Sequence, residues 1–233
     1  MNNNIDVSVT SDDLDTRFTR TAEKWRPVFY KLAWLGFSYP TVKTVEEITS
    51  GEFTRGMQET ASKLNFEVPD RSLSKAKSFS EEATEFNLEK MENEYVRLFI
   101  SDTGGPSVYP HASYYLDGEV MGKSVQAIVD EYSSTGFSKS SRYSGQPDHI
   151  SVLLEYMFKL SLNIDNGFLE EQARFYDEYV MPWHGEFTEK VIRETDNEFY
   201  KLLATWTEHG LKTDRKILKK LLNDSLESGP EGV

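Results

Sequence analysis

Cysteine is absent from this chain of 233 residues. Its absence excludes disulfides, thiolate zinc sites, protein-held iron–sulfur clusters and cysteine nucleophiles. The sequence also lacks a glycine-rich phosphate loop, a nucleophile elbow and any HExxH-type spacing of histidines. We therefore expect no metal site and no cofactor in this protein. The chain has four histidines: His111, His149, His184 and His209.

Long apolar runs are missing as well. No stretch approaches the roughly 20 apolar residues that a membrane-spanning helix needs, and the mean hydropathy is -0.57. The first residues are polar and acidic, without the basic start and apolar stretch of a secretory signal. We expect a cytoplasmic protein with no direct membrane insertion.

Positive charge is scarce relative to negative charge. The chain has 26 Lys and Arg against 39 Asp and Glu, a formal net charge of -13. Such a protein repels phosphate backbones, so we expect no nucleic-acid partner. The same field attracts a basic peptide. The alternative is that the charge serves solubility alone.

Alternation of period two is scarce, whereas helical spacing of apolar residues is found nearly everywhere, which predicts an all-α fold. Pro27 lies inside the first predicted helix and should kink or divide it. The expected helices cover residues 14–37, two short segments within 42–64, a segment from Ser80 through Phe99, and 119–132, 148–162, 167–180, 183–204 or beyond, and 213–222.

The middle of the chain contains several helix breakers between residues 101 and 118. They predict a structured loop or a hinge. An all-helical domain of residues 14–222 would then have halves of about 14–100 and 119–222, arranged either as one bundle or as two subdomains. Residues 1–13 are expected to be disordered, and residues 223–233 to form a flexible tail.

Two groups of residues stand out as candidate binding residues. Tyr95, Leu98 and Phe99 share one apolar helix face, which indicates a core stripe or one wall of an apolar groove. The loop that follows carries stiff aromatic and proline residues, which suit either a wall for a peptide or a plug on the core. These loop residues are Pro106, Tyr109, Pro110, His111, Ser113 and Tyr114.

A third group begins at Pro147. Asp148 follows this proline where a helix should start, so its carboxylate is expected to cap that helix. Glu155 comes two turns later on nearly the same face, and two carboxylates on an exposed stripe can receive an arginine guanidinium. His149 beside Asp148 also allows an acid–base role, although adjacent side chains at a helix start do not face each other.

These elements together resemble the signature of the TorD/DmsD/NarJ family of redox-enzyme maturation chaperones. The order and spacing match, and the direct Pro147-Asp148 junction is similar to the NarJ-like branch. His111-Ala112-Ser113 departs from the usual loop sequence. The matching segments are Tyr95-x-x-Leu98-Phe99, the proline loop with Ser113 and Tyr115, Pro147-Asp148-His149, Leu154-Glu155-Tyr156-Met157, Pro182-Trp183 and residues 199–204.

The resemblance implies a TorD-like helical bundle without chemistry of its own. It implies a cytoplasmic chaperone that binds the twin-arginine leader, or an apoprotein segment, of the catalytic subunit of a molybdenum-cofactor oxidoreductase before export. The expected peptide-binding residues are Tyr95, Leu98, Phe99, Pro106, Tyr109, Pro110, His111, Ser113, Tyr114, Asp148, His149 and Glu155. A helical adaptor without leader binding and an acid–base hydrolase using Asp148 and His149 are the alternatives. The protein is expected to be a monomer or a dimer.

Overall fold

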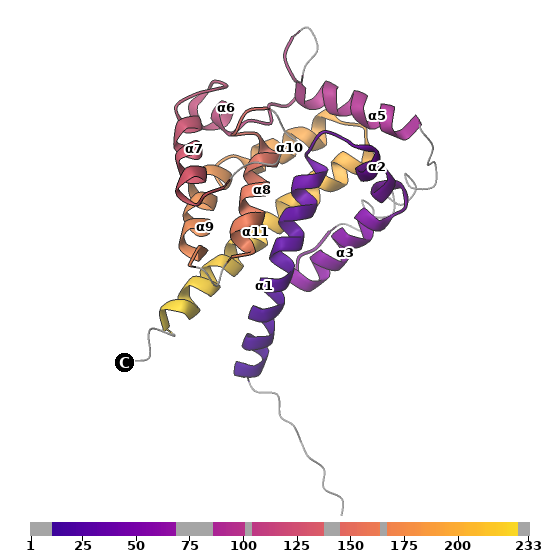
Figure 1. The fold of residues 1–233 in the computed structure, drawn as a ribbon. Coiled ribbons are helices and arrows are strands. Elements are labelled where there is room, and N and C mark those ends of the chain that lie inside the picture. Colours follow the sequence, from indigo (N-terminus) through magenta and orange to yellow (C-terminus); the bar gives the residue numbers. More distant parts are fainter. Residues whose placement is uncertain (1–10, 69–85, 101–103, 138–144, 164–166, 228–233) are drawn as a thin grey trace, which may run out of the picture.

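The structure is a computed structural model that describes residues 11–68, 86–100, 104–137, 145–163 and 167–227, with backbone only for residues 11–16 and 86–87. Within these ranges the chain is helical and contains no strand, as predicted (Figure 1). The elements are α1 (Ser11–Gly36), α2 (Val42–Thr49), α3 (Glu52–Leu64), α5 (Phe86–Tyr95), η1 (Val96–Ile100), α6 (Ala112–Asp117), α7 (Ser124–Ser134), α8 (Ile150–Ser161), α9 (Leu169–Phe175), η3 (Tyr176–Val180), α10 (His184–Glu194) and α11 (Glu198–Glu227).

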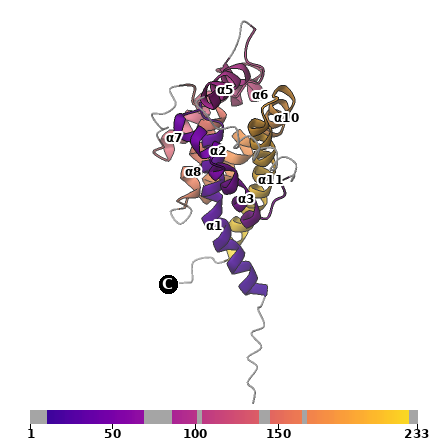
Figure 2. The same cartoon turned by 90° about the vertical axis from the view of Figure 1, so that its right-hand side faces the viewer.

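Helix α1 is central to the arrangement. It packs against α8, α3 and α11 (Figures 1 and 2). Its inward face carries buried residues at helical spacing, among them Ala22, Phe29 and Ala33. Pro27 lies inside the helix without dividing it, so one of the two outcomes expected for this proline is wrong.

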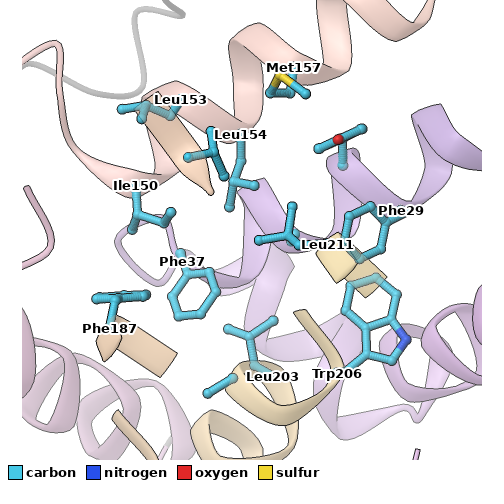
Figure 3. Packing of buried hydrophobic residues seen from close by; sticks show 14 of the residues in the cluster. Phe29, Phe37, Ile150, Leu153, Leu154, Met157, Phe187, Leu203, Trp206 and Leu211 are labelled. Carbon is cyan, nitrogen blue, oxygen red and sulfur yellow. The ribbon is translucent and has the colours of Figure 1, made fainter. Parts of the chain in front are cut away.

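Both halves of the chain contribute to one hydrophobic core. Figure 3 shows residues from α1 and α8 facing residues from α10 and α11. The two predicted halves therefore pack against each other through this core. The residues labelled there are Phe29, Phe37, Ile150, Leu153, Leu154, Met157, Phe187, Leu203, Trp206 and Leu211.

A buried polar network also joins α1 to α11. The guanidinium of Arg26 donates to Asp214 Oδ1 through Nε at 2.5 Å, and to Gln172 Oε1 through Nη2 at 2.7 Å. Tyr30 donates its hydroxyl proton to Asp214 Oδ2 at 2.5 Å. Arg26 and Asp214 are both fully buried, so each compensates a charge that would otherwise be very costly there.

The helix boundaries confirm some predictions and correct others. Two short helices, α2 and α3, do fill residues 42–64. The predicted helix 183–204 is wrong, because α10 ends at Glu194 and a new helix begins at Glu198. Asn197 caps the new helix by accepting from the N–H groups of Phe199 at 3.0 Å and Tyr200 at 3.2 Å. From there α11 runs unbroken to Glu227, so 213–222 is not a separate helix.

Other helix boundaries also differ from those expected. Helices α1 and α11 extend by a few residues into the segments expected to be disordered or flexible, at residues 11–13 and 223–227. Residues 112–117 form the short helix α6 inside the supposed loop, and Gly118 ends it in a left-handed conformation with φ 80°. The next helix starts at Ser124, where Asp117 Oδ2 accepts from Ser124 N at 2.9 Å, and not at residue 119. The helix start expected at Ser80, and residues 1–10, 138–144 and 228–233, lie outside the described residues.

No described helix is long and apolar enough to cross a membrane.

Candidate peptide-binding site

The proline loop and the start of α8 meet in space although they are distant in sequence. Ala112 N donates to Asp148 O at 2.9 Å, and Ile150 N donates to Pro110 O at 2.8 Å. These two bonds form an antiparallel bridge between His111 and His149. The loop is therefore clamped to the segment that leads into α8.

The end of the α5–η1 segment joins the same junction. Val108 N donates to Leu98 O at 2.8 Å, which attaches the loop to η1. The hydroxyl of Tyr95 lies 3.4 Å from His149 Nε2 and donates to Phe37 O at 3.4 Å. The three candidate segments, which are the end of α5–η1, the proline loop and the start of α8, therefore meet at this junction.

Asp148 was predicted to cap α8, but its carboxylate holds the loop instead. Its carboxylate is completely buried, and Oδ2 accepts from Ser113 N at 3.0 Å and from Ser113 Oγ at 2.6 Å. The N-cap of α8 is His149, whose Nδ1 accepts from Ser151 N at 3.1 Å. The cap was expected at Asp148 because aspartate is a common capping residue, whereas histidine is not.

Two histidines face each other across the bridge. The ring centroids of His111 and His149 are 5.5 Å apart. Burial lowers the pKa of His111, although the nearby Asp148 carboxylate raises it in part. Burial, and secondarily His111, lowers the pKa of His149 well below its usual value. These shifts favour the neutral form of both imidazoles.

The junction contains buried polar atoms that have no hydrogen-bond partner among the described residues. They are Asp148 Oδ1, Gln146 Oε1 and His111 Nδ1. The two oxygens accept hydrogen bonds, and so does the ring nitrogen when the proton of a neutral imidazole is on Nε2. The site therefore lacks donors. Gln146 was not among the predicted residues, because a glutamine before a proline carries no distinctive sequence signal.

The loop aromatics pack on one another and on the protein. The rings of Tyr109 and Tyr114 stack with centroids 4.0 Å apart, and Tyr115 stacks on Trp183 at 5.0 Å. Lys190 Nζ lies 5.5 Å from the Tyr114 ring centroid and 5.0 Å from that of Tyr115. This arrangement matches the interpretation of the loop as a plug on the core.

The exposure expected for the two carboxylates is wrong, because Asp148 and Glu155 are both buried. Tyr95, Leu98 and Phe99 are buried as well, as expected for a core stripe. The two carboxylates do not form an exposed stripe, because every residue from Ile150 to Met157 is covered by neighbouring elements. Two surface cavities, of about 420 and 270 Å³, are lined partly by the carboxy-terminal part of α8, and none of the predicted peptide-binding residues lines either one.

The junction offers little for the acid–base hydrolase alternative. Ser151 Oγ lies 2.8 Å from His149 Nδ1, but Ser151 is only 1% exposed and His149 only 3%. A substrate has no access to this pair in the structure described. Among the residues that the structure describes, no group of three or more His, Asp or Glu side chains is arranged to hold a metal ion.

The chain is thus an all-α helical protein in which the proline loop is clamped to the start of α8. The chain belongs to the family described as nitrate reductase delta subunit, whose sequence pattern matches residues 55–189. This match agrees with the resemblance found from the motifs.

Named relatives are TorD chaperones, not enzymes. The chaperone protein TorD of Shewanella oneidensis is 30% identical over 142 residues, covering 58% of this chain and 63% of the relative. TorD of Colwellia psychrerythraea is 27% identical over 152 residues, covering 54% and 63% respectively. This chain therefore spans a little under two thirds of the length of both relatives.

A solved structure supports the fold. A crystal structure of a candidate redox enzyme maturation protein from Archaeoglobus fulgidus has a TM-score of 0.52 and 24% identity. The comparison covers 83% of this chain and 93% of that chain.

Proposed function

We propose that this protein is a cytoplasmic maturation chaperone for the catalytic subunit of a molybdenum-cofactor oxidoreductase. It binds the twin-arginine leader, or an apoprotein segment, and holds the subunit back from export until the cofactor is inserted. Family membership and the TorD chaperones among the relatives support this proposal.

The observation that carries the leader-binding role is the shortage of donors at the junction. Asp148 Oδ1 and Gln146 Oε1 are buried acceptors without partners. An unpaired buried polar group costs roughly 1–3 kcal/mol, more if it is charged. A guanidinium supplies several N–H donors in a plane and a positive charge, so an arginine of the leader is chemically complementary to this pair.

Binding at this place requires the loop to move. The Asp148 carboxylate is fully buried under the loop, and two backbone hydrogen bonds and Ser113 hold the loop down. An arriving peptide displaces the loop, so that the end of η1 at Leu98 receives the apolar part of the leader. The ring of Phe99 stays packed against Phe187 and Tyr200. The free energy needed to open the loop reduces the net free energy of peptide binding, so we expect micromolar or somewhat tighter affinity.

The test is titration of a labelled twin-arginine leader peptide into the wild-type protein and into Asp148→Asn. The substitution removes the charge but keeps the side-chain size. We expect the affinity to fall at least about tenfold, equal to about 1.4 kcal/mol. A peptide with both arginines changed to lysine should lose a similar amount with the wild-type protein, because lysine cannot form the bidentate contact.

Asp130→Asn is the matched control. Asp130 is an exposed residue of α7 whose carboxylate accepts from Gln126 at 2.9 Å, so the variant has the same change in net charge away from the junction. Folding of both variants is checked by circular dichroism. Equal affinities for wild-type protein and Asp148→Asn, or equal losses in both variants, would remove the proposed role of Asp148.

A further inference from the structure

The outer face of α1 carries a stripe of positive charge. Arg17, Arg20, Lys24 and Lys31 are all exposed and follow one another at spacings of three, four and seven residues, which places them on one side of the helix. The stripe is about 21 Å long at 1.5 Å per residue. None of the four forms an ion pair with a described acidic side chain. Because Asp12, Asp13 and Asp15 precede Arg17, we assign the main role to Lys24 and Lys31.

A cavity of about 420 Å³ opens along this stripe, between α1 and the end of α8. Its walls include Pro27, Val28, Phe158 and Leu162, and Lys24 and Lys31 also line it. Leu162 is 55% exposed there. Glu23 is the carboxylate among the lining residues. This volume lies in the range typical of ligand pockets, and the lining combines apolar with polar and charged side chains in about equal share.

We propose that this cationic groove binds an acidic polypeptide segment of a partner protein, with an apolar side chain of the segment in the cavity. The charge of the groove is opposite to that of the whole chain, which has a net charge of -13. Unpaired cations beside apolar surface complement carboxylates beside an apolar side chain. The groove is separate from the junction of the proposed leader site, and a basic leader is the wrong charge for it.

The extent of the groove favours a peptide over other anionic partners. A membrane surface or a polynucleotide extends well beyond a stripe of about 21 Å, and would meet the acidic remainder of the molecule. A short peptide contacts the stripe alone. The apolar walls also gain nothing from a phosphate backbone, whereas a leucine or phenylalanine side chain buries its surface there.

The test uses a fluorescein-labelled peptide rich in glutamate with two phenylalanines, and measures its binding by fluorescence anisotropy. We expect saturable binding that weakens when salt is raised from roughly 20 to 300 mM, because the contacts are exposed ion pairs. In the double variant Lys24→Glu/Lys31→Glu the affinity should fall at least tenfold. A glutamine version of the peptide should not bind measurably.

The matched control is Lys216→Glu/Lys219→Glu. Both lysines are exposed on α11, away from the buried side that this helix turns toward α1, and the variant has the same change in net charge. Equal losses in the two double variants would show a net-charge effect and overturn the proposal. Absence of saturable peptide binding would also overturn it. So would a result in which phosphatidylserine vesicles or an oligonucleotide bind more tightly than the peptide and this binding is lost in Lys24→Glu/Lys31→Glu. Leader binding should survive this double variant, so the two proposals fail independently.

Discussion

Removing the Asp214 carboxylate should destabilise the protein more than almost any other single change. Asp214 and Arg26 are both fully buried, and Asp214 accepts hydrogen bonds from Arg26 and Tyr30. In Asp214→Ala the guanidinium stays in the core without its countercharge, and the tyrosine hydroxyl loses its acceptor. Arg26 Nη1 already lacks a hydrogen-bond partner, so no spare contact compensates.

The expected cost follows from the burial of the pair. Breaking a buried ion pair by removing one partner costs about 3–5 kcal/mol, because an uncompensated charge remains in the core. For a protein of this size, 1 kcal/mol shifts the melting temperature by about 2–4 °C, so we expect a fall of roughly 6–20 °C. A loss of this size is a large share of the 5–15 kcal/mol typical of folded proteins.

Urea unfolding followed by circular dichroism measures this effect. The midpoint should fall while the slope stays unchanged, since the surface exposed on unfolding is the same. Asp177→Ala is the control, because Asp177 pairs with Arg215 on the surface and its side chain is 38% exposed. That variant should lose less than about 1 kcal/mol. The double variant Arg26→Met/Asp214→Leu should recover much of the stability, because a buried pair can be replaced by apolar side chains.

One result would refute this reasoning. If Asp214→Ala lost no more stability than Asp177→Ala, the buried network would not be compensating a charge in the core. Either the guanidinium would then reach solvent, or the packing of α1 against α11 would differ from the structure described.

Three further predictions concern stability. Gly210→Ala should lower the free energy of unfolding by about 1–3 kcal/mol, although alanine favours helices, because its Cβ would lie 2.1 Å from Phe29 Cε2. Adding Phe29→Leu should restore part of this loss, as measured by urea unfolding. Burial raises the pKa of Glu208, but hydrogen bonds from His184 and other neighbours outweigh it and bring the pKa to about 2. Its contribution is therefore complete above pH 4.5 and is lost as the pH falls toward 2, so Glu208→Gln should be less stable at pH 7 and show a flatter loss below pH 4.5. His149→Asn keeps a side-chain acceptor at the N-cap of α8. Because the pKa of His149 is lowered in the folded protein, the wild type should lose stability as the pH falls below 6.5. The variant should lose less stability, which thermal unfolding measured between about pH 7 and 5 will show.

The helices were predictable from the sequence because their signals are local. Apolar spacing identified α1, α2, α3 and α8 within a few residues of their ends. The failures occurred where a single polar side chain decided a boundary. Asn197 starts α11 by capping it, and His149 takes the capping role expected of Asp148.

The candidate site was predictable in its residues but not in its exposure. Motif order selected the Leu98, Pro110 and Asp148 segments, and the structure brings those segments together. Their peptide-binding role stays a prediction. The burial of Asp148 and Glu155 escaped the sequence argument because carboxylates on a helix are usually exposed, and only the elements packed around α8 cover them.

The sequence by itself determined that this chain forms amphipathic helices, and in what order its distinctive segments occur. Helical hydrogen bonds join residues four positions apart, so these features depend on near neighbours. Tertiary packing alone decided that the loop is clamped over Asp148, that Arg26 finds Asp214 188 positions away, and that a cationic groove opens beside α8. Those contacts join distant parts of the chain, and a linear pattern contains no measure of which distant surfaces meet.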